Sequence, residues 1–314
     1  MNDIDSSIPE RSELREDVVQ DRFVLVAPKR GARPKDVVPE LDPESDPSDD
    51  PFSKEETFET VLHEDLGADG GVVRAIPNKF PAVSKDNPSA YGTQEVVVET
   101  PEFGIELAEF SVEQTCAVLR TYAARLRAIS EDAKIRYILV FKNKGGKAGA
   151  SLRHAHSQIF ASEFVPPHIV RKAERLREFR RENGVDYYEH LFEQEEGGPR
   201  HIWSDERMLT FAPYASLYPY EAWIVPRRRV DNISLLSEEE LGSLAAALHH
   251  VIQTLHAQNM PYNFYMHQTI EDDVEHFCLR VAPRVNTWAG VELGSRLIIN
   301  TVSPEEAALF YRSL

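Results

Sequence analysis

Residues 143 to 158 hold the side chains of this chain that are best suited to phosphate chemistry. The segment reads Asn-Lys-Gly-Gly-Lys-Ala-Gly-Ala-Ser-Leu-Arg-His-Ala-His-Ser-Gln. Glycines let a backbone approach a ligand closely and direct N–H groups at phosphate oxygens. Gly145 and Gly149 are therefore candidate phosphate contacts. The side chains of Asn143 and Ser151 can donate further hydrogen bonds without adding charge.

Two histidines and a glutamine alternate at the end of this segment. On an extended strand, residues two apart face the same side, so His154, His156 and Gln158 would line one surface beside the loop. A neutral imidazole has a lone pair that can attack phosphorus, and a bond from its other nitrogen to a backbone carbonyl would fix the tautomer. A His-x-His pair alone is also typical of metal ligands or of a structural coincidence. The glycine loop, Ser151 and Gln158 in register favour catalysis.

The charge distribution indicates where a small anion would bind. The chain carries 52 acidic and 35 basic residues, a net charge of -17, yet residues 133 to 162 contain no Asp or Glu. A basic stretch in an acidic protein is expected at an anion site, although a solvated helix face gives the same pattern. We take Lys144 and Arg153 as candidate phosphate-binding cations. The net negative charge of the protein argues against a general nucleic-acid binder.

Composition predicts a globular protein of the cytoplasm. The chain has 314 residues, of which 42% are hydrophobic, and no apolar run near the roughly 20 residues that cross a bilayer. Its start lacks the basic-then-apolar order of a signal peptide. Cys116 and Cys278 form no CxxC, which argues against a disulfide framework and a cysteine zinc site. We therefore expect no membrane partner.

Local signals predict helices and strands in alternation. Capping signals predict helix starts at Ser111, Ser237 and Ser303, and a charged helix from Pro166 to Asn183 ends at Gly184. Residues 1 to 20 and 36 to 58 are acidic and poor in large apolar residues, so we expect a flexible start and a long surface loop. Runs rich in β-branched and aromatic residues predict strands at 23–27, 72–76, 95–99, 137–141 and 156–160.

The second half repeats the first in outline. A strand with a proline turn, a long helix, a strand and a loop into a His-bearing strand run from Arg74 to Phe160 and recur from Met208 to Pro283. Helices alternating with mostly antiparallel strands give an α+β fold of two similar lobes, each a sheet packed with helices.

The segment at 143–158 resembles the galactose-1-phosphate uridylyltransferase branch of the histidine-triad superfamily. The family signature Asn-x-Gly…Gly-x-Ser-x-x-His-Pro-His-x-Gln matches without a gap, with Ala155 in place of proline. The resemblance implies a histidine-triad-like catalytic domain at 1–195 and a degenerate domain of the same kind at 196–314. It also implies that His156 is the nucleophile.

The same resemblance implies roles for the residues around His156. Gln158 and Ser151 would stabilise the transferred phosphoryl group, and His154 would support the site. The reaction would be ping-pong: a nucleotide sugar leaves its nucleotide, most simply UMP, on His156, and a sugar 1-phosphate collects it. The family is commonly a dimer with sites near the subunit interface, so we expect a homodimer.

Three further segments look like family landmarks. Residues 23 to 34 resemble an N-terminal strand with an Arg-x-x-Arg-Pro turn, which implies phosphate contacts from Arg30 and Arg33. Residues 77 to 81 resemble a segment that lies against the nucleotide and includes Asn78. Residues 290 to 292 resemble a late Gly-Tyr-Glu segment. Its Glu292 would contact the sugar, and the nearby Trp288 could stack on a sugar or base.

Departures from the family pattern limit what the resemblance implies. Asp50 to Ser53 and Thr100 to Phe103 stand where three zinc ligands are expected, so we predict no zinc, no cofactor and a hydrogen-bonding role for His154. A second metal site could draw on His267, His276 and Cys278, although a degenerate repeat explains these residues as well. Asn286, at a candidate sugar-binding position, and Val291 replace a lysine and a tyrosine, which puts galactose specificity in doubt.

Two alternative functions follow from the same residues. A phosphorylase of ADP-glucose or of a dinucleoside polyphosphate would use the same His156 intermediate but hand the nucleotide to phosphate or a nucleoside diphosphate. A nucleotide-binding module that has lost catalysis would never form the covalent adduct.

Overall fold

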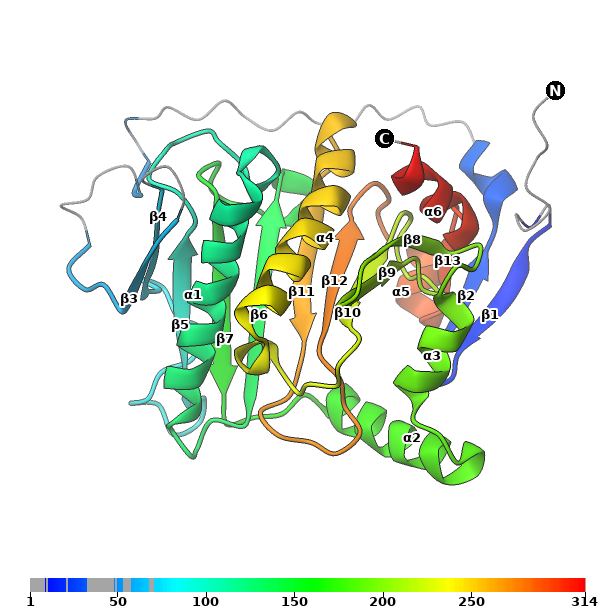
Figure 1. Cartoon of the computed structure of the whole chain (residues 1–314), viewed down its shortest axis with the longest axis horizontal. Helices are drawn as coiled ribbons and strands as arrows, with labels where there is room; N and C mark the ends of the chain where they lie inside the picture. The colour runs from blue at the N-terminus through cyan, green and yellow to red at the C-terminus, as the bar shows by residue number, and fades with distance from the viewer. Residues whose placement is uncertain are drawn as a thin grey trace.

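A computed structural model describes residues 9, 11–20, 22–32, 48, 50–52, 58–67 and 71–313. Antiparallel strands build one large sheet, and helices pack against it (Figure 1), so the predicted α+β class is confirmed. In sheet order, its strands are β3 (His63–Leu66), β4 (Val72–Pro77), β5 (Gly92–Val98), β7 (His156–Ser162), β6 (Tyr137–Lys144), β11 (Tyr262–His267), β12 (Cys278–Pro283), β10 (Ala222–Pro226), β9 (Met208–Phe211) and β8 (His201–Ser204).

A small second sheet contains the N-terminal strands. Its order is β1 (Glu13–Asp17), β2 (Arg22–Val26) and β13 (Ile298–Asn300), with β13 parallel to β2. The helices are α1 (Val112–Ser130), α2 (Pro167–Asn183), α3 (Tyr187–Glu195), α4 (Glu238–Ala257), α5 (Gly290–Ser295) and α6 (Pro304–Arg312).

The two halves of the chain contribute matching halves of the large sheet. From its first edge inward, the first half supplies β3, β4, β5, β7 and β6, and from the other edge the second half supplies β8, β9, β10, β12 and β11. The halves join where β6 pairs with β11. Registers match as well, because Gln158 lies opposite Phe141 and Arg280 lies opposite Tyr265. The boundary at residue 195 itself stays a prediction.

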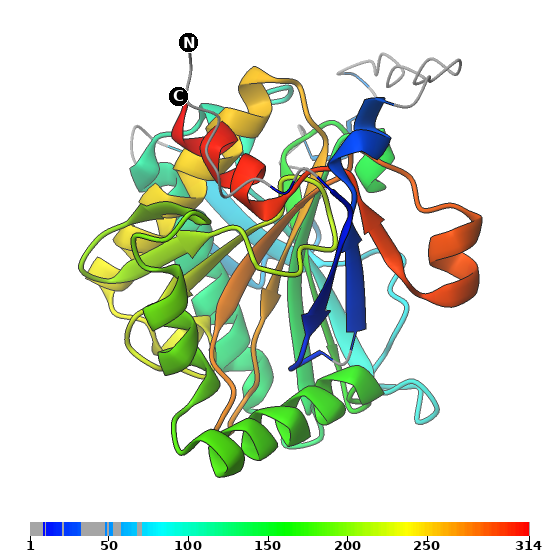
Figure 2. The same cartoon turned by 90° about the vertical axis from the view of Figure 1, so that its right-hand side faces the viewer.

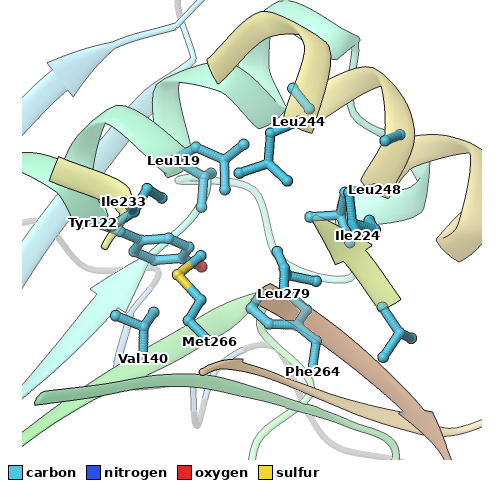
Figure 3. Close-up of a cluster of buried hydrophobic side chains, with 14 of the residues drawn as sticks. Leu119, Tyr122, Val140, Ile224, Ile233, Leu244, Leu248, Phe264, Met266 and Leu279 are labelled. Carbon is cyan, nitrogen blue, oxygen red and sulfur yellow. The ribbon is translucent and has the colours of Figure 1, made fainter. Parts of the chain in front are cut away.

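The main core lies between the sheet and the helices α1 and α4, which run side by side across one face (Figures 1 and 2). Figure 3 shows side chains from both helices meeting side chains from strands of both halves. Leu119 and Tyr122 of α1 and Leu244 of α4 are buried with Val140 and Phe264. Alternation along each strand sends one set of side chains into this core and leaves the other set on the opposite face. That opposite face carries the candidate site.

The predicted helix boundaries hold because their signals are local. Ser111, Ser237 and Ser303 each accept a hydrogen bond from the backbone N–H three residues later, at the starts of α1, α4 and α6. Gly184 ends α2 with φ of 74°, a conformation that favours glycine.

The expectation of a flexible start was wrong for residues 13 to 17. Residues 13 to 17 form β1, because they pair with β2 and because the buried Arg15 bonds to Glu305 at 3.0 Å. Most of 36–58 lies outside the described residues, but Asp50 is buried at 6% exposure. Among the described helices, none has the length and apolar character needed to cross a membrane.

Candidate active site

His156 is the first residue of β7, and one of its two ring nitrogens is hydrogen-bonded to the backbone. Its Nδ1 lies 2.8 Å from the carbonyl oxygen of His154, so Nδ1 carries the proton and donates. In the part of the chain that the structure describes, Nε2 has no hydrogen-bond partner. Burial lowers the pKa of His156, and the charge of Lys142 adds to this effect, while the bond to the His154 carbonyl opposes it. The ring is therefore neutral near pH 7, with a lone pair on Nε2.

That nitrogen faces a cavity of about 590 Å³. One side of the cavity is apolar, with Phe52 and Phe58 packed over Ile76 and Val96. Its polar lining consists of Glu59, Thr60, Asn78, Lys79, Ser151, His156 and Gln158. An apolar wall beside a few convergent polar groups is the usual form of a small-molecule site.

The side chain of Gln158 is held with its amide nitrogen toward the cavity. Its Oε1 accepts hydrogen bonds from Gln94 Nε2 at 2.8 Å and from Asn78 Nδ2 at 3.3 Å. Because both bonds occupy the oxygen, the two N–H groups of Gln158 remain for a ligand beside His156.

A buried polar network lies beneath the nucleophile on the helix side of the sheet. Lys142 Nζ bonds to Glu99 Oε2 at 2.7 Å and to the carbonyl oxygen of His156 at 3.2 Å. Tyr122 of α1 bonds through its hydroxyl to Glu99 at 3.2 Å and to Ser157 at 2.6 Å. All members of the network are buried, so their hydrogen bonds are protected from water. They hold the backbone of β7 at His156 and Ser157.

His154 is fully engaged with oxygen atoms. Its Nδ1 lies 2.7 Å from Asp50 Oδ2, and its Nε2 lies 2.7 Å from the carbonyl oxygen of Thr100. Both partners come from the stretches that replace the zinc ligands of the family. A metal needs a free imidazole lone pair, which this arrangement does not leave, so the residues present do not fit zinc here. The Asp50 contact also brings Phe52 against both histidine rings, at 5.6 Å from each.

The glycine segment forms a tight turn that carries Ser151 to the cavity. Gly145 and Gly149 have φ of 87° and 82°, which only glycine adopts without strain. The N–H groups of residues 148 to 150 bond back to carbonyl oxygens of residues 145 and 146. In this structure the N–H of Gly149 is thus spent inside the turn and does not point at a ligand, contrary to the sequence interpretation. Asn263 clamps the turn by donating to the carbonyl of Ala148 at 2.7 Å.

Several other predicted contacts do not line this cavity. Asn143 accepts a bond from Asn263 at 2.7 Å and lines a neighbouring cavity of about 390 Å³. Lys144 and Arg153 are absent from the described lining. Arg33 lies outside the described residues.

Four predicted ligand contacts lie at the other end of the molecule from β4 and β5. Arg30 follows β2, and Glu292 lies in α5, both beside the small sheet (Figure 1). Glu292 accepts a bond from the backbone N–H of Ala289. Asn286 bonds to Thr301, and Trp288 stacks on Tyr218 at 5.4 Å between ring centroids. None of these four lines the described cavity at His156.

The matching position of the second half is filled by protein. Cys278 and Arg280 occupy the places of His156 and Gln158, and Cys278 packs with Leu176 of α2 and Tyr188 of α3. His276 has both ring nitrogens bonded to backbone atoms, and burial lowers its pKa to about 4. Among the described residues, no three His, Cys, Asp or Glu side chains converge as metal ligands.

Sequence reasoning missed Gln94, Glu99, Lys142 and Asp50. One signal for Lys142 was present, because it continues the inward-facing set of β6 after Ile138 and Val140. A charge on a core-facing position needs a buried partner. Nothing local to Gln94 or Asp50 indicates their partners, which lie 64 and 104 residues away.

Fold and site together define an α+β protein of two similar halves, with a cavity lined by His156 in the first half. Residues 71–166 match the model of the galactose-1-phosphate uridyl transferase N-terminal domain. The galactose-1-phosphate uridylyltransferase of Thermotoga maritima is 31% identical, over 74% of this chain and 81% of that protein. The chain belongs to the galactose-1-phosphate uridylyltransferase family.

A second relative matches this chain almost from end to end. ADP-glucose phosphorylase of Arabidopsis thaliana is 29% identical, over 99% of this chain and 95% of that protein. A crystal structure of that plant enzyme with bound ADP-glucose superposes with a TM-score of 0.85, covers 96% of this chain and 99% of its own, and shares 27% identity. Relatives that are transferases and phosphorylases support an enzyme.

Proposed function

We propose that this protein transfers a nucleoside monophosphate through a covalent intermediate on His156. The lone pair on Nε2 attacks the α-phosphorus of a nucleoside diphosphate sugar and forms an N–P bond. The P–O bond to the leaving group breaks, and a sugar 1-phosphate departs with the electron pair. An acceptor oxygen then attacks the same phosphorus and releases His156. The observation that carries the proposal is the Nδ1 bond to the His154 carbonyl, which leaves Nε2 unbonded among the described residues and facing the cavity.

The cavity supplies groups for each charge that develops. The His154 carbonyl oxygen stabilises the positive charge of the nucleotidylated ring through the Nδ1 proton. Gln158 and Ser151 donate to the oxygens of the transferred phosphoryl group, and Lys79 at the rim supplies positive charge. Donors fixed before the reaction stabilise a transition state without reorganisation.

Donor base and acceptor distinguish two candidate reactions. The match to the A. thaliana ADP-glucose phosphorylase over almost the whole chain supports adenylyl transfer to inorganic phosphate. The T. maritima relative supports uridylyl transfer to a hexose 1-phosphate, but over three quarters of the chain. Asn286 and Val291 stand where the transferase pattern has lysine and tyrosine. We therefore favour phosphorolysis of ADP-glucose and keep uridylyl transfer as the second candidate.

Intact mass at alkaline pH tests the covalent step. Wild type and His156→Ala are incubated separately with ADP-glucose and UDP-glucose. We expect a mass gain of one nucleoside monophosphate in wild type only, since phosphoramidates survive alkali, and the labelling donor identifies the base. No gain with either donor, together with equal nucleotide binding by both proteins, would establish a binding module instead.

Acceptor analysis then separates the two reactions. Isolated labelled protein is mixed with inorganic phosphate or with galactose 1-phosphate. Release of a nucleoside diphosphate by phosphate alone supports the phosphorylase. Release of a nucleotide sugar only with the sugar phosphate supports the transferase.

We further propose that the active form is a homodimer in which the partner completes each site. Arg30 and Glu292, which the family pattern assigns to ligand contacts, lie at the other end of the chain from β4 and β5 (Figure 1). A second copy related by a two-fold axis, with the two chains antiparallel, would bring them to His156.

Complementation between subunits tests this arrangement. Differently tagged His156→Ala and Glu292→Ala chains are co-expressed and the mixed species is purified. Each variant alone is expected to be impaired. A mixed dimer with cross-subunit sites has one intact site and regains up to half of the wild-type activity per dimer, whereas sites within single chains give no recovery.

A further inference from the structure

We propose that Gln94 is a positioning residue that fixes which end of the Gln158 amide faces the reacting phosphoryl group. The proposal rests on the proposed function, in which Gln158 donates to that group. Gln94 belongs to β5 and lies two positions from the direct partner of Gln158, so the two side chains share one face of the sheet.

The direction of each bond follows from groups that can act in one way only. A glutamine amide can donate from nitrogen or accept at oxygen, and the two ends are nearly the same shape. The backbone N–H of Ala82 can only donate, and it donates to Gln94 Oε1 at 2.9 Å. Gln94 must then present Nε2 to its other partner, which is Gln158 Oε1 at 2.8 Å. Gln158 is left with its NH2 group toward the cavity.

A second amide reinforces the same orientation. The backbone N–H of Phe80 donates to Asn78 Oδ1 at 2.8 Å, which directs Asn78 Nδ2 to Gln158 Oε1 at 3.3 Å. Gln94 makes the shorter bond and also holds this loop, since its backbone oxygen accepts from the Asn78 N–H at 2.9 Å. Asn78 is thereby assigned to the support of Gln158, in addition to any contact with nucleotide.

Orientation matters because a reversed amide would repel the substrate. A carbonyl oxygen directed at phosphoryl oxygens adds repulsion where two donors are needed. Removing one preorganised donor of this kind typically slows the chemical step by about 100-fold to 1,000-fold. The effect falls on the transition state, where the phosphoryl oxygens gain charge, and so on the rate at saturation more than on donor binding.

The substitution Gln94→Glu tests the inference with almost no change of shape. The carboxylate still accepts from the Ala82 N–H but cannot donate to Gln158 Oε1. Gln158 is expected to turn its NH2 toward the carboxylate and its oxygen toward the cavity. Single-turnover nucleotidylation is measured with ADP-glucose, or with UDP-glucose if only that donor labels wild type. We expect the saturating rate to fall by about 100-fold, with half-saturation changing less than about threefold.

The control and the double variant separate positioning from a general structural role. Gln253→Glu makes the same change at an exposed position of α4 and should leave the rate unchanged. In a Gln158→Ala background, Gln94→Glu should slow the reaction by less than about threefold, because Gln94 acts through Gln158. Thermal unfolding checks that each variant is folded. If Gln94→Glu does not fold, Gln94→Met provides an uncharged variant that also cannot donate to Gln158.

Each result has a distinct meaning. Equal losses from Gln94→Glu in both backgrounds, or a rate within threefold of wild type, would overturn the positioning role while the covalent mechanism stands. If wild type itself forms no adduct with either donor, the proposed function fails, and the catalytic role of Gln94 fails with it.

Discussion

Lys142 offers a direct test of the buried network beneath His156. Lys142→Met keeps the length and apolar stem of the side chain and removes its charge. Glu99, which is 0% exposed, then loses the ammonium group 2.7 Å from its Oε2 and keeps only the Tyr122 hydroxyl among the contacts described above. Breaking a buried ion pair on one side destabilises a protein by about 3–5 kcal/mol. That is a large share of the roughly 5–15 kcal/mol by which domains are stable.

Urea unfolding at pH 7.5, followed by circular dichroism, measures the loss. Burial lowers the pKa of Lys142, but the carboxylates of Glu106, 3.4 Å from Nζ, and of Glu99 outweigh burial and raise the pKa above its usual value of about 10.5. A raised pKa gives stability that is complete below the unfolded value and is lost as pH rises through the folded value, so pH 7.5 reports the full contribution. Lys85→Met is the matched control. Its pair with Asp132 is half exposed on the lysine side, and we expect a loss of about 1 kcal/mol or less.

The double variant Lys142→Met with Glu99→Gln completes the test. Neutral glutamine no longer needs a cation, so the double variant should be more stable than Lys142→Met alone by about 1–3 kcal/mol. A Lys142→Met loss no larger than that of the Lys85 control would refute the reasoning. So would a double variant that is less stable than the single one.

Three further predictions concern the site itself. Because burial lowers the pKa of His156 from 6.5, the acid limb of nucleotidylation at low donor concentration should be centred below pH 6.5; an acid limb centred above 6.5 in a pH-rate profile would contradict this. Treatment with EDTA should leave labelling unchanged, because both ring nitrogens of His154 contact oxygen and neither is left for a metal. Loss of labelling that added zinc restores would contradict this prediction. Gly149→Ala should lower stability in urea by about 1–2 kcal/mol, because φ is 82° and no atom lies within 4 Å of the new methyl group. Gly242→Ala, equally open but within α4, should instead be stabilising by about 0.5–1 kcal/mol, and equal effects at both glycines would exclude backbone strain as the cause.

The parts of the fold that sequence could predict are those set by neighbours along the chain. Ser237 and Glu240 cap each other within one turn, and Gly184 ends α2 by its own conformation. The strand β1 was missed because its stability comes from elsewhere, namely from β2 and from the contact of Arg15 with Glu305, 290 residues away.

The site divides in the same way. The alternation of His154, His156 and Gln158 in the sequence was enough to put His156 and Gln158 at the cavity and to anticipate the carbonyl bond that fixes the tautomer. It was wrong for His154, which precedes β7, is buried and does not line the cavity. It was not enough to find what turns the Gln158 amide, because Gln94 meets it only when β5 pairs with β7. Nor could it reveal that Arg30 and Glu292 lie beside the small sheet, since that depends on the path of the whole chain.

The two similar halves differ in what covers the face of the sheet opposite α1 and α4. In each half, the first and third residues of one strand lie on this face, His156 and Gln158 in the first half and Cys278 and Arg280 in the second. In the second half this face is covered by α2 and α3, and burial raises the pKa of Cys278 and so suppresses its thiolate. The corresponding face of the first half is not covered by α2 and α3, because these helices, which follow β7 in the chain, pack on the second half. The second half also supports the site of the first half. Its strand β11 pairs with β6, and Asn263 of β11 bonds to the turn that carries Ser151.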